Sequence, residues 1–169
     1  MSLGKQFLSE LEQESQATKR VLERVPQDKL AWRPHPKSFS LGQLALHIAQ
    51  GPAQIIGMAK LDSIEVPNFT QEEAKSVTEL IDTLGKGLEY ARAELPSMDD
   101  AYLSQSWTVM ANGNAVMAMP RAAVLRTILL NHSYHHRGQL TVYLRLLDVP
   151  LPAVYGNSAD ENPFANSAH

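Results

Sequence analysis

Three histidines in this chain have a spacing that suits metal binding. His132 and His136 are four residues apart, so on a helix their imidazoles lie on one face, one turn apart. That spacing lets two ring nitrogens reach one ion at roughly 2.1 Å. His47 lies on an earlier apolar stripe beside Leu44 and Ile48, which predicts that its ring also points inward. Three imidazoles without a fourth protein ligand would leave a coordination position for water or substrate, the pattern of catalytic sites.

The same histidines have a purely structural interpretation. A His-x-x-x-His pair occurs by chance on many helices, and a buried histidine often only hydrogen-bonds a carbonyl group. The other three histidines are weaker candidates. His135 lies one position from the inward face and is expected at an edge, and His35 lies in a proline-rich loop as a structural residue. His169 is the last residue of the chain and is expected to be disordered.

The composition excludes several classes of chemistry and partner. The chain has 169 residues, of which 44% are hydrophobic and 20% charged, and we predict a single domain over residues 1–169. It contains no cysteine, which excludes disulfides, thiolate ligands and a cysteine nucleophile. Its net charge is −3 and no Lys/Arg cluster occurs, so we expect no nucleic-acid partner.

The distribution of apolar residues bears on the compartment. No apolar run approaches the ~20 residues that a membrane span requires. The N-terminus is polar from its first residues and lacks the hydrophobic centre of a signal peptide. We therefore expect a cytoplasmic protein with no membrane partner.

Hydrophobic periodicity predicts four helices. They are expected over residues 3–25, 40–58, 71–95 and 120–147. Pro26 should end the first helix. Ser40 and Gln43 fit a capping box at the start of the second, and Gly51-Pro52 predicts a kink or a break within it, because Pro52 cannot donate its helical hydrogen bond.

The segment between the third and fourth predicted helices has a different pattern. Two short apolar runs, Trp107–Met110 and Ala115–Met119, flank Asn112-Gly113, a pair typical of tight hairpin turns. A hairpin of this size is marginal alone and must pack on the helices. We therefore predict an all-α four-helix bundle with a small β-hairpin inserted between helices 3 and 4.

Around the histidines the sequence resembles the DinB-like (DinB/YfiT-like) metalloenzyme superfamily. The resemblance covers nearly the whole chain and is carried by Trp32–Ala49, Asn131–Leu140 and Pro152–Glu161. The His-Arg-Gly-Gln ending of the second segment is its most specific part. The resemblance implies an up-down-down-up bundle with a three-histidine metal site. Its ligands would fall on His47, His132 and His136.

The resemblance also suggests an activity. Relatives of this kind look like metal-dependent transferases that join low-molecular-weight thiols to electrophiles, or thiol-using isomerases. Our leading hypothesis is a metal-dependent thiol S-transferase, in which the metal lowers the pKa of the thiol. One alternative is a metal-dependent hydrolase, although no acidic residue stands one or three positions after a ligand. The other is a non-catalytic protein that binds a metal or a small ligand.

Further site residues and the metal are less closely defined. Imidazoles suit several divalent transition metals, and we favour zinc or nickel over iron or manganese. Arg137 could contact an anionic substrate or pair with an acidic side chain. Tyr155 and residues 158–161 could fold over the site, or Tyr155 could pack as an aromatic cap. Gly138 and Gln139 are interpreted as helix-packing residues. The family suggests a homodimer through outer helix faces.

Overall fold

Long helices dominate the structure, a computed structural model that describes residues 1–66, 68 and 70–164. His169 lies outside the described residues. The main helical elements are α1 (Leu3–Leu22), α2 (Leu41–Ala59), α3 (Val77–Glu94) and a continuous segment formed by α5 (Arg121–Val124), the π-helical η3 (Leu125–Asn131) and α6 (His132–Leu146). The short elements are the 3₁₀ turns η1 (Gln27–Lys29) and η2 (Leu95–Ser97), the helix α4 (Asp100–Ser104), and the strands β1 (Ser63–Glu65), β2 (Ser106–Ala111) and β3 (Asn114–Pro120).

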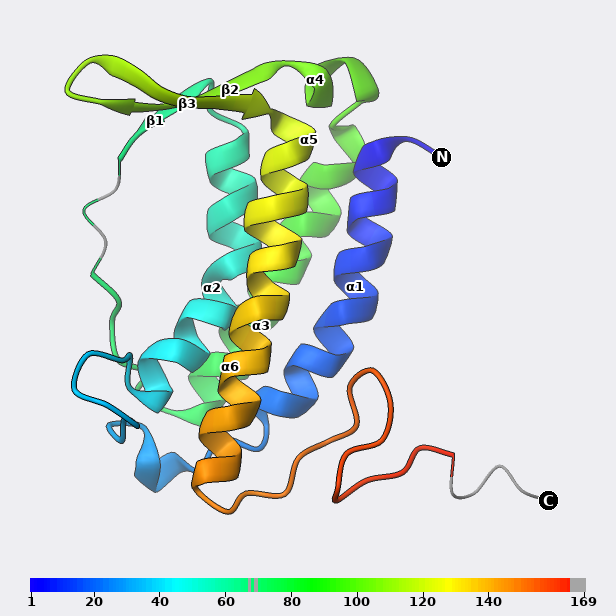
Figure 1. Cartoon of the computed structure of the whole chain (residues 1–169). Helices are drawn as coiled ribbons and strands as arrows, with labels where there is room; N and C mark the ends of the chain where they lie inside the picture. The colour runs from blue at the N-terminus through cyan, green and yellow to red at the C-terminus, as the bar shows by residue number, and fades with distance from the viewer. Residues whose placement is uncertain (67, 69, 165–169) are drawn as a thin grey trace.

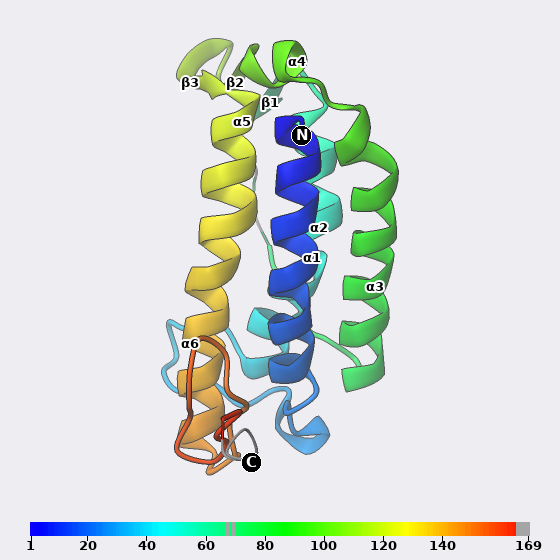
Figure 2. The ribbon, with the colours of Figure 1, turned by 90° about the vertical axis from the view of Figure 1, so that its right-hand side faces the viewer.

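The long helical segments lie side by side, with the sheet across one end (Figures 1 and 2). In Figure 1, α1 and the α5–α6 segment run away from the sheet, whereas α2 and α3 run toward it. The segments α2 and α6 are therefore antiparallel, and they are in contact. The prediction of a mostly helical chain is confirmed. None of the described helices is long and apolar enough to cross a membrane.

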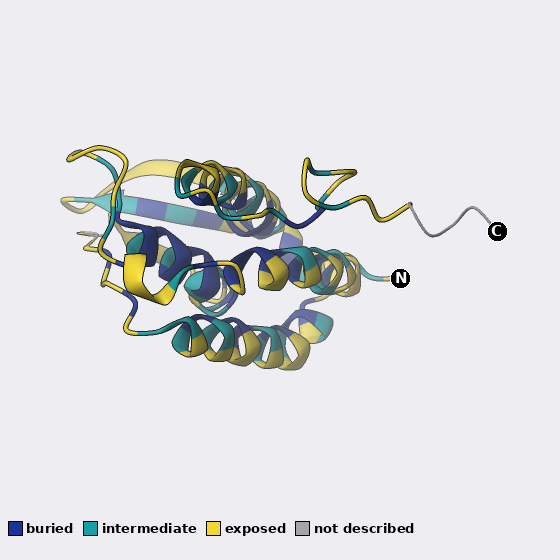
Figure 3. Ribbon diagram, turned by 90° about the horizontal axis from the view of Figure 1, so that it is seen from below, coloured by how far each residue is buried: buried dark blue, intermediate teal, exposed yellow. Residues whose placement is uncertain are grey.

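The buried residues lie mainly on the sides of the helices that face one another (Figure 3). They form two apolar clusters, one built around Leu22, Leu44, Leu80, Leu140 and Leu144 and the other around Leu11, Ile56, Leu95, Trp107 and Leu129. In the sequence, His47 stands between Leu46 and Ile48 of the first cluster, and His132 stands two positions after Leu130 of the second. The candidate ligands therefore stand next to buried residues of both clusters along α2 and the α5–α6 segment.

The predicted helix boundaries need two corrections. The first helix ends at Leu22 rather than at residue 25. The third begins at Val77 rather than at residue 71, because the Ser76 side chain accepts the Glu79 amide N–H and caps the helix there. The residues before Ser76 form a loop instead of a first helical turn.

The predicted second helix agrees more closely with the structure. The Ser40–Gln43 capping box is confirmed, with both of its hydrogen bonds present. Pro52 does not break α2, which continues to Ala59 and bends in its middle (Figure 1). Opposite Pro52 stands Gly87 of α3, where a Cβ atom would lie 3.1 Å from the Pro52 Cβ. The two helices thus approach closely at the proline.

The sheet contains one more strand than we predicted. β2 and β3 pair antiparallel around Asn112 and Gly113, which both have positive φ angles, 52° and 76°, as a tight primed turn requires. The strand β1 pairs parallel to β2. Its three residues are too few to give a periodic signal in the sequence. The Trp107 indole N–H donates to the Met58 carbonyl at 3.0 Å and fastens the sheet to α2.

The last long helical segment departs from regular α-helical geometry just before the histidine pair. Its π-helical part η3 ends at Asn131, directly before His132. Leu125, Leu129 and Leu130 of this segment are all fully buried. Segments of π-helix within α-helices are frequent at functional sites.

Candidate metal centre

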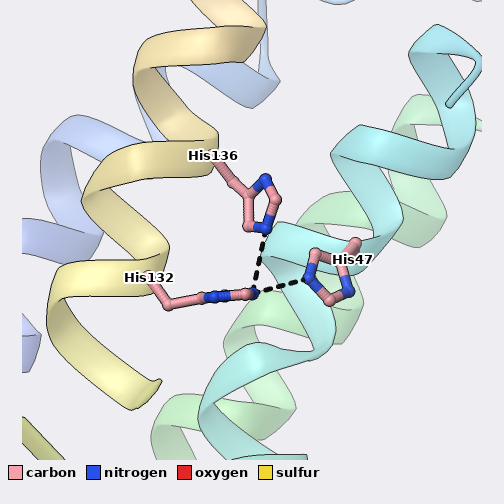
Figure 4. Close-up of side chains that lie close together, drawn as sticks. All are labelled: His47, His132 and His136. Atoms are coloured by element: carbon pink, nitrogen blue, oxygen red, sulfur yellow. Dashed lines mark hydrogen bonds between the residues drawn. The ribbon is translucent and has the colours of Figure 1, made fainter. Parts of the chain in front are cut away.

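His47, His132 and His136 come together between α2 and α6 (Figure 4). The Nε2 atom of His132 lies 3.0 Å from the Nε2 of His47 and 2.9 Å from the Nε2 of His136. One nitrogen from each of the three residues falls within a group no wider than 4.8 Å. The antiparallel helices therefore bring together the three residues that the sequence singled out.

The separations between these nitrogens fit a shared cation. Metal–nitrogen bonds of about 2.1 Å place two ligand nitrogens about 3.0 Å apart at a right angle and about 3.4 Å apart at a tetrahedral angle. The two measured separations lie at the short end of this range. Among the described residues, the group consists of the three imidazoles and includes no carboxylate. Such a donor set suits a divalent transition metal rather than calcium or magnesium.

The surroundings keep the three imidazoles neutral. Burial, together with the neighbouring His136 and His47, lowers the pKa of His132 to about 4. Burial also lowers the pKa values of His47 and His136. Although His132 is an exposed residue, its Nε2 lies within 3.0 Å of the Nε2 atoms of the other two rings. At neutral pH each imidazole therefore keeps one unprotonated ring nitrogen, and the neutral ring is the form in which histidine binds metals.

Two glutamine side chains contact the outer nitrogens of the cluster. The Nδ1 of His47 lies 3.2 Å from the Oε1 of Gln71, and the Nδ1 of His136 lies 2.7 Å from the Oε1 of Gln139. The interpretation of Gln139 as a packing residue is incomplete, and its i+3 spacing from His136 is the sequence signal for this contact. The sequence pattern predicts Gln71 at the start of a helix, and nothing in the local sequence links it to His47.

A small hollow adjoins the histidines on the sheet side of the cluster. Its walls come from α2, η3 and α6, and its lining residues are His47, Ile48, Gly51, Gln54, Ile55, Ile128, His132, Ser133 and His136. Its volume of about 20 Å³ is enough for roughly one water-sized group. The rest of the lining is uncharged, and its polar side chains are Gln54 and Ser133.

Arg137 and Tyr155 lie on the other side of α6. The Arg137 side chain is 3% exposed and pairs with the Glu14 carboxylate of α1 at 2.6 Å. The Tyr155 hydroxyl accepts from Arg137 at 2.5 Å and donates to Glu14 at 2.6 Å. The structural alternative for Arg137, pairing with an acidic side chain, is therefore the arrangement observed, and both residues contact α1 instead of the histidines.

The remaining candidates also lie away from the three nitrogens. Residues 158–161 do not fold over the histidines as one hypothesis expected, because Glu161 binds Arg20 of α1 and the segment follows the side of α6 opposite α2 (Figure 1). His135 is exposed, with its ring centroid 5.0 Å from that of His136. His35 lies exposed in its loop, where its Nδ1 accepts the Lys37 amide N–H.

Comparison of the whole sequence with known proteins identifies the family of this chain. The model of the DinB family matches residues 1–163. The chain belongs to the DinB family. It is 24% identical over 162 residues to the protein YrdA of Bacillus subtilis (strain 168), described as uncharacterised, and the match covers 92% of this chain and 89% of YrdA. The resemblance found in the sequence is thus confirmed.

Solved structures of DinB-like proteins share the fold. One from Bacillus cereus ATCC 10987 has a TM-score of 0.67 at 24% identity, covering 88% of this chain and 95% of that one. The protein YjoA of Bacillus subtilis has a TM-score of 0.66 at 19% identity, with coverages of 88% and 96%. A protein of Exiguobacterium sibiricum 255-15, also assigned to the DinB family, has a TM-score of 0.62 at 17% identity, with coverages of 90% and 97%. At these identities the likeness shows the fold alone.

Proposed function

We propose that this DinB family member is a metal-dependent enzyme, built on an up-down-down-up four-helix bundle, that joins a low-molecular-weight thiol to a small electrophile. His47, His132 and His136 would hold one divalent transition metal, with zinc or nickel ahead of iron or manganese. The observation that carries the proposal is the convergence of three Nε2 atoms. That of His132 lies 3.0 Å from the Nε2 of His47 and 2.9 Å from the Nε2 of His136. Their lowered pKa values support the same conclusion.

The reacting thiol would come from solution, since the chain has no cysteine. A divalent metal held by the histidines would act as a Lewis acid and lower the pKa of a thiol. The protein's own residues keep the ligands neutral and in place. The exposed edge of His132 and the hollow beside it leave access for a small molecule.

Metal-assisted hydrolysis is the second candidate and ranks lower. It requires a general base within hydrogen-bond reach of the attacking water. Among the described residues that line the hollow beside the histidines there is no Asp or Glu to serve as that base. A non-catalytic protein that binds a metal or a small ligand is the third candidate.

The metal content of the protein tests the site itself. Protein purified without metal-affinity resin should contain about one equivalent of a transition metal in elemental analysis. Reconstitution of metal-free protein with zinc, nickel, iron or manganese would then rank the metals by affinity. A chain that is isolated free of metal and takes up none on reconstitution would contradict the proposal.

A thiol panel separates the three functions. Each thiol is incubated with the electrophile monochlorobimane, with and without a chelator, and conjugate formation is measured by fluorescence. We expect turnover that the chelator abolishes and that the His136→Ala variant lacks. Persistent turnover in that variant would exclude the metal mechanism. Absence of turnover with every thiol, together with tight binding of a small ligand, would favour the non-catalytic function.

A further inference from the structure

Gln71 is a buried side chain whose polar atoms are all engaged. It lies in the loop between β1 and α3 and is 7% exposed. Its Nε2 donates to the Gln50 Oε1 at 3.2 Å and to the Glu72 carbonyl at 3.3 Å. Its Oε1 lies 3.2 Å from the Nδ1 of His47. Gln71 thus contacts two residues of α2 from a loop that is distant in sequence.

These contacts determine which nitrogen of His47 carries the proton. A glutamine amide has two N–H donors and one acceptor oxygen. Because the Gln71 donors point at the oxygens of Gln50 and Glu72, its own oxygen must face His47. An oxygen there requires an N–H on Nδ1. A neutral imidazole has a single N–H, so the Nε2 of His47 presents a lone pair toward His132.

A related contact exists on the other side of the cluster. The Gln139 Oε1 lies 2.7 Å from the Nδ1 of His136, and in this amide orientation the Nε2 of His136 also presents a lone pair. Both lone pairs point at the Nε2 of His132, which has at most one hydrogen to donate in its neutral form. Two lone pairs and a third nitrogen that converge in this way are best satisfied by one cation.

We propose that Gln71 is a positioning residue of the metal centre, which holds His47 in the metal-binding tautomer and in the correct ring orientation. This inference rests on the proposed function. Groups that accept a hydrogen bond from a ligating histidine orient its ring and raise its basicity. Gln139 plays the same part for His136 from within α6, whereas Gln71 makes the loop before α3 a part of the site.

The loop that carries Gln71 is itself fastened to the start of α2. The Gln43 side chain donates to the Gln71 carbonyl at 3.0 Å, and the Ser40 hydroxyl donates to the Glu73 carboxylate at 2.6 Å. These are the two residues of the capping box. One set of hydrogen bonds therefore starts α2, holds the loop and orients the ligand that α2 contributes.

Two substitutions of Gln71 test this role in the full-length protein. Gln71→Leu removes the acceptor for the Nδ1 proton, whereas Gln71→Glu retains one. Zinc affinity is measured by competition with a chromophoric chelator, and the absorption spectrum of the cobalt-loaded protein reports the ligand geometry. We expect Gln71→Leu to bind zinc about 10- to 100-fold more weakly and to alter the cobalt spectrum. Gln71→Glu keeps an acceptor for the Nδ1 proton but loses the donors to Gln50 and Glu72, so it should bind zinc more tightly than Gln71→Leu.

Gln27→Leu is the matched control. Gln27 donates to the Lys75 carbonyl at 3.2 Å and accepts the Val77 amide N–H at 2.9 Å, so it anchors the same loop without contacting His47. Its substitution should lower the melting temperature of the metal-free protein and leave the zinc affinity unchanged. An equal loss of affinity in Gln27→Leu and Gln71→Leu would overturn the inference, since anchoring of the loop would then explain both.

Failure of the inference differs from failure of the proposed function. If the wild type binds zinc and Gln71→Leu binds it equally well, Gln71 does not position the ligand and the metal site stands. If Gln71→Glu is as weak as Gln71→Leu, the role of the acceptor is refuted in the same way. If the wild type itself binds no transition metal, the proposed function fails and the inference fails with it.

Discussion

The Nε2 atoms of His47 and His132 lie 3.0 Å apart, although 85 positions separate the two residues in the sequence. His132 also contacts His136 at 2.9 Å, so it is the central member of the cluster. We predict that His132→Ala lowers the affinity for zinc by more than the roughly 100-fold loss that follows removal of an outer partner. Competition with a chromophoric chelator measures the change.

His135→Ala is the control for that substitution. His135 is exposed on the same helical turns, and its nitrogens are not among those that converge on the site. Its removal should leave zinc affinity close to that of the wild type. Equal affinities for the His132→Ala and His135→Ala variants would show that zinc does not bind at the cluster.

The metal-free protein should lose stability as the pH falls. The pKa of His132 is about 4 in the folded chain against an ordinary value of 6.5, so between these values the unfolded chain binds more protons and acid favours unfolding. The contribution of His132 to the free energy of unfolding is fully present above pH 6.5 and is lost progressively as the pH falls toward 4. Because His132 is partly exposed, we expect an effect of about 1 to 2 kcal/mol.

Urea unfolding of metal-free protein at a series of pH values checks this dependence. Carboxylates titrate in the same acidic range, so the informative quantity is the difference between the wild type and His132→Ala. The free energy of unfolding should fall more steeply with acidification in the wild type. Parallel curves for the two proteins would mean that the pKa of His132 is not lowered by folding.

The features that could be predicted from the sequence are those encoded within a few neighbouring residues. The capping box of Ser40 and Gln43 needs only a three-residue spacing, and His132 and His136 need only one helical turn. The turn at Asn112-Gly113 follows from two residues that tolerate positive φ angles. Each of these signals is local, so no knowledge of the tertiary structure was required.

The features that could not be predicted depend on contacts between distant segments. Gln71 reaches His47 across 24 positions, and β1 forms only because β2 is available to pair with it. The fully buried Arg121 binds the carbonyl of Ala59 and the carboxylate of Asp62, a contact that a charged residue at a helix start does not suggest.

Arg137 should be essential for stability and dispensable for metal binding. The side chains of Arg137 and Glu14 form an ion pair at 2.6 Å and are 3% and 14% exposed. Arg137→Ala leaves the largely buried Glu14 carboxylate without its ion-pair partner. This loss should lower the free energy of unfolding by about 3 to 5 kcal/mol. Urea unfolding measures this loss, and zinc titration of the folded protein should give the affinity of the wild type.

The reverse pattern for Arg137 would support its role as an anion-binding residue. In that case Arg137→Ala would keep its stability and lose turnover with an anionic electrophile. The double substitution of Arg137 and Glu14 by alanine provides a further check. If the two residues act as a pair, it should cost less than the sum of the single substitutions.

Tyr155→Phe removes only the hydroxyl that links Arg137 and Glu14. That hydroxyl accepts from Arg137 at 2.5 Å and donates to Glu14 at 2.6 Å, while the residue as a whole is 72% exposed. We expect a loss of about 1 kcal/mol in the free energy of unfolding, with turnover per bound metal unchanged, because the hydroxyl faces α1 rather than the hollow beside the histidines. A Tyr155→Phe variant with wild-type stability and strongly reduced turnover would instead place this hydroxyl at the reacting groups, and the C-terminal segment would then have to move toward α2 during the reaction.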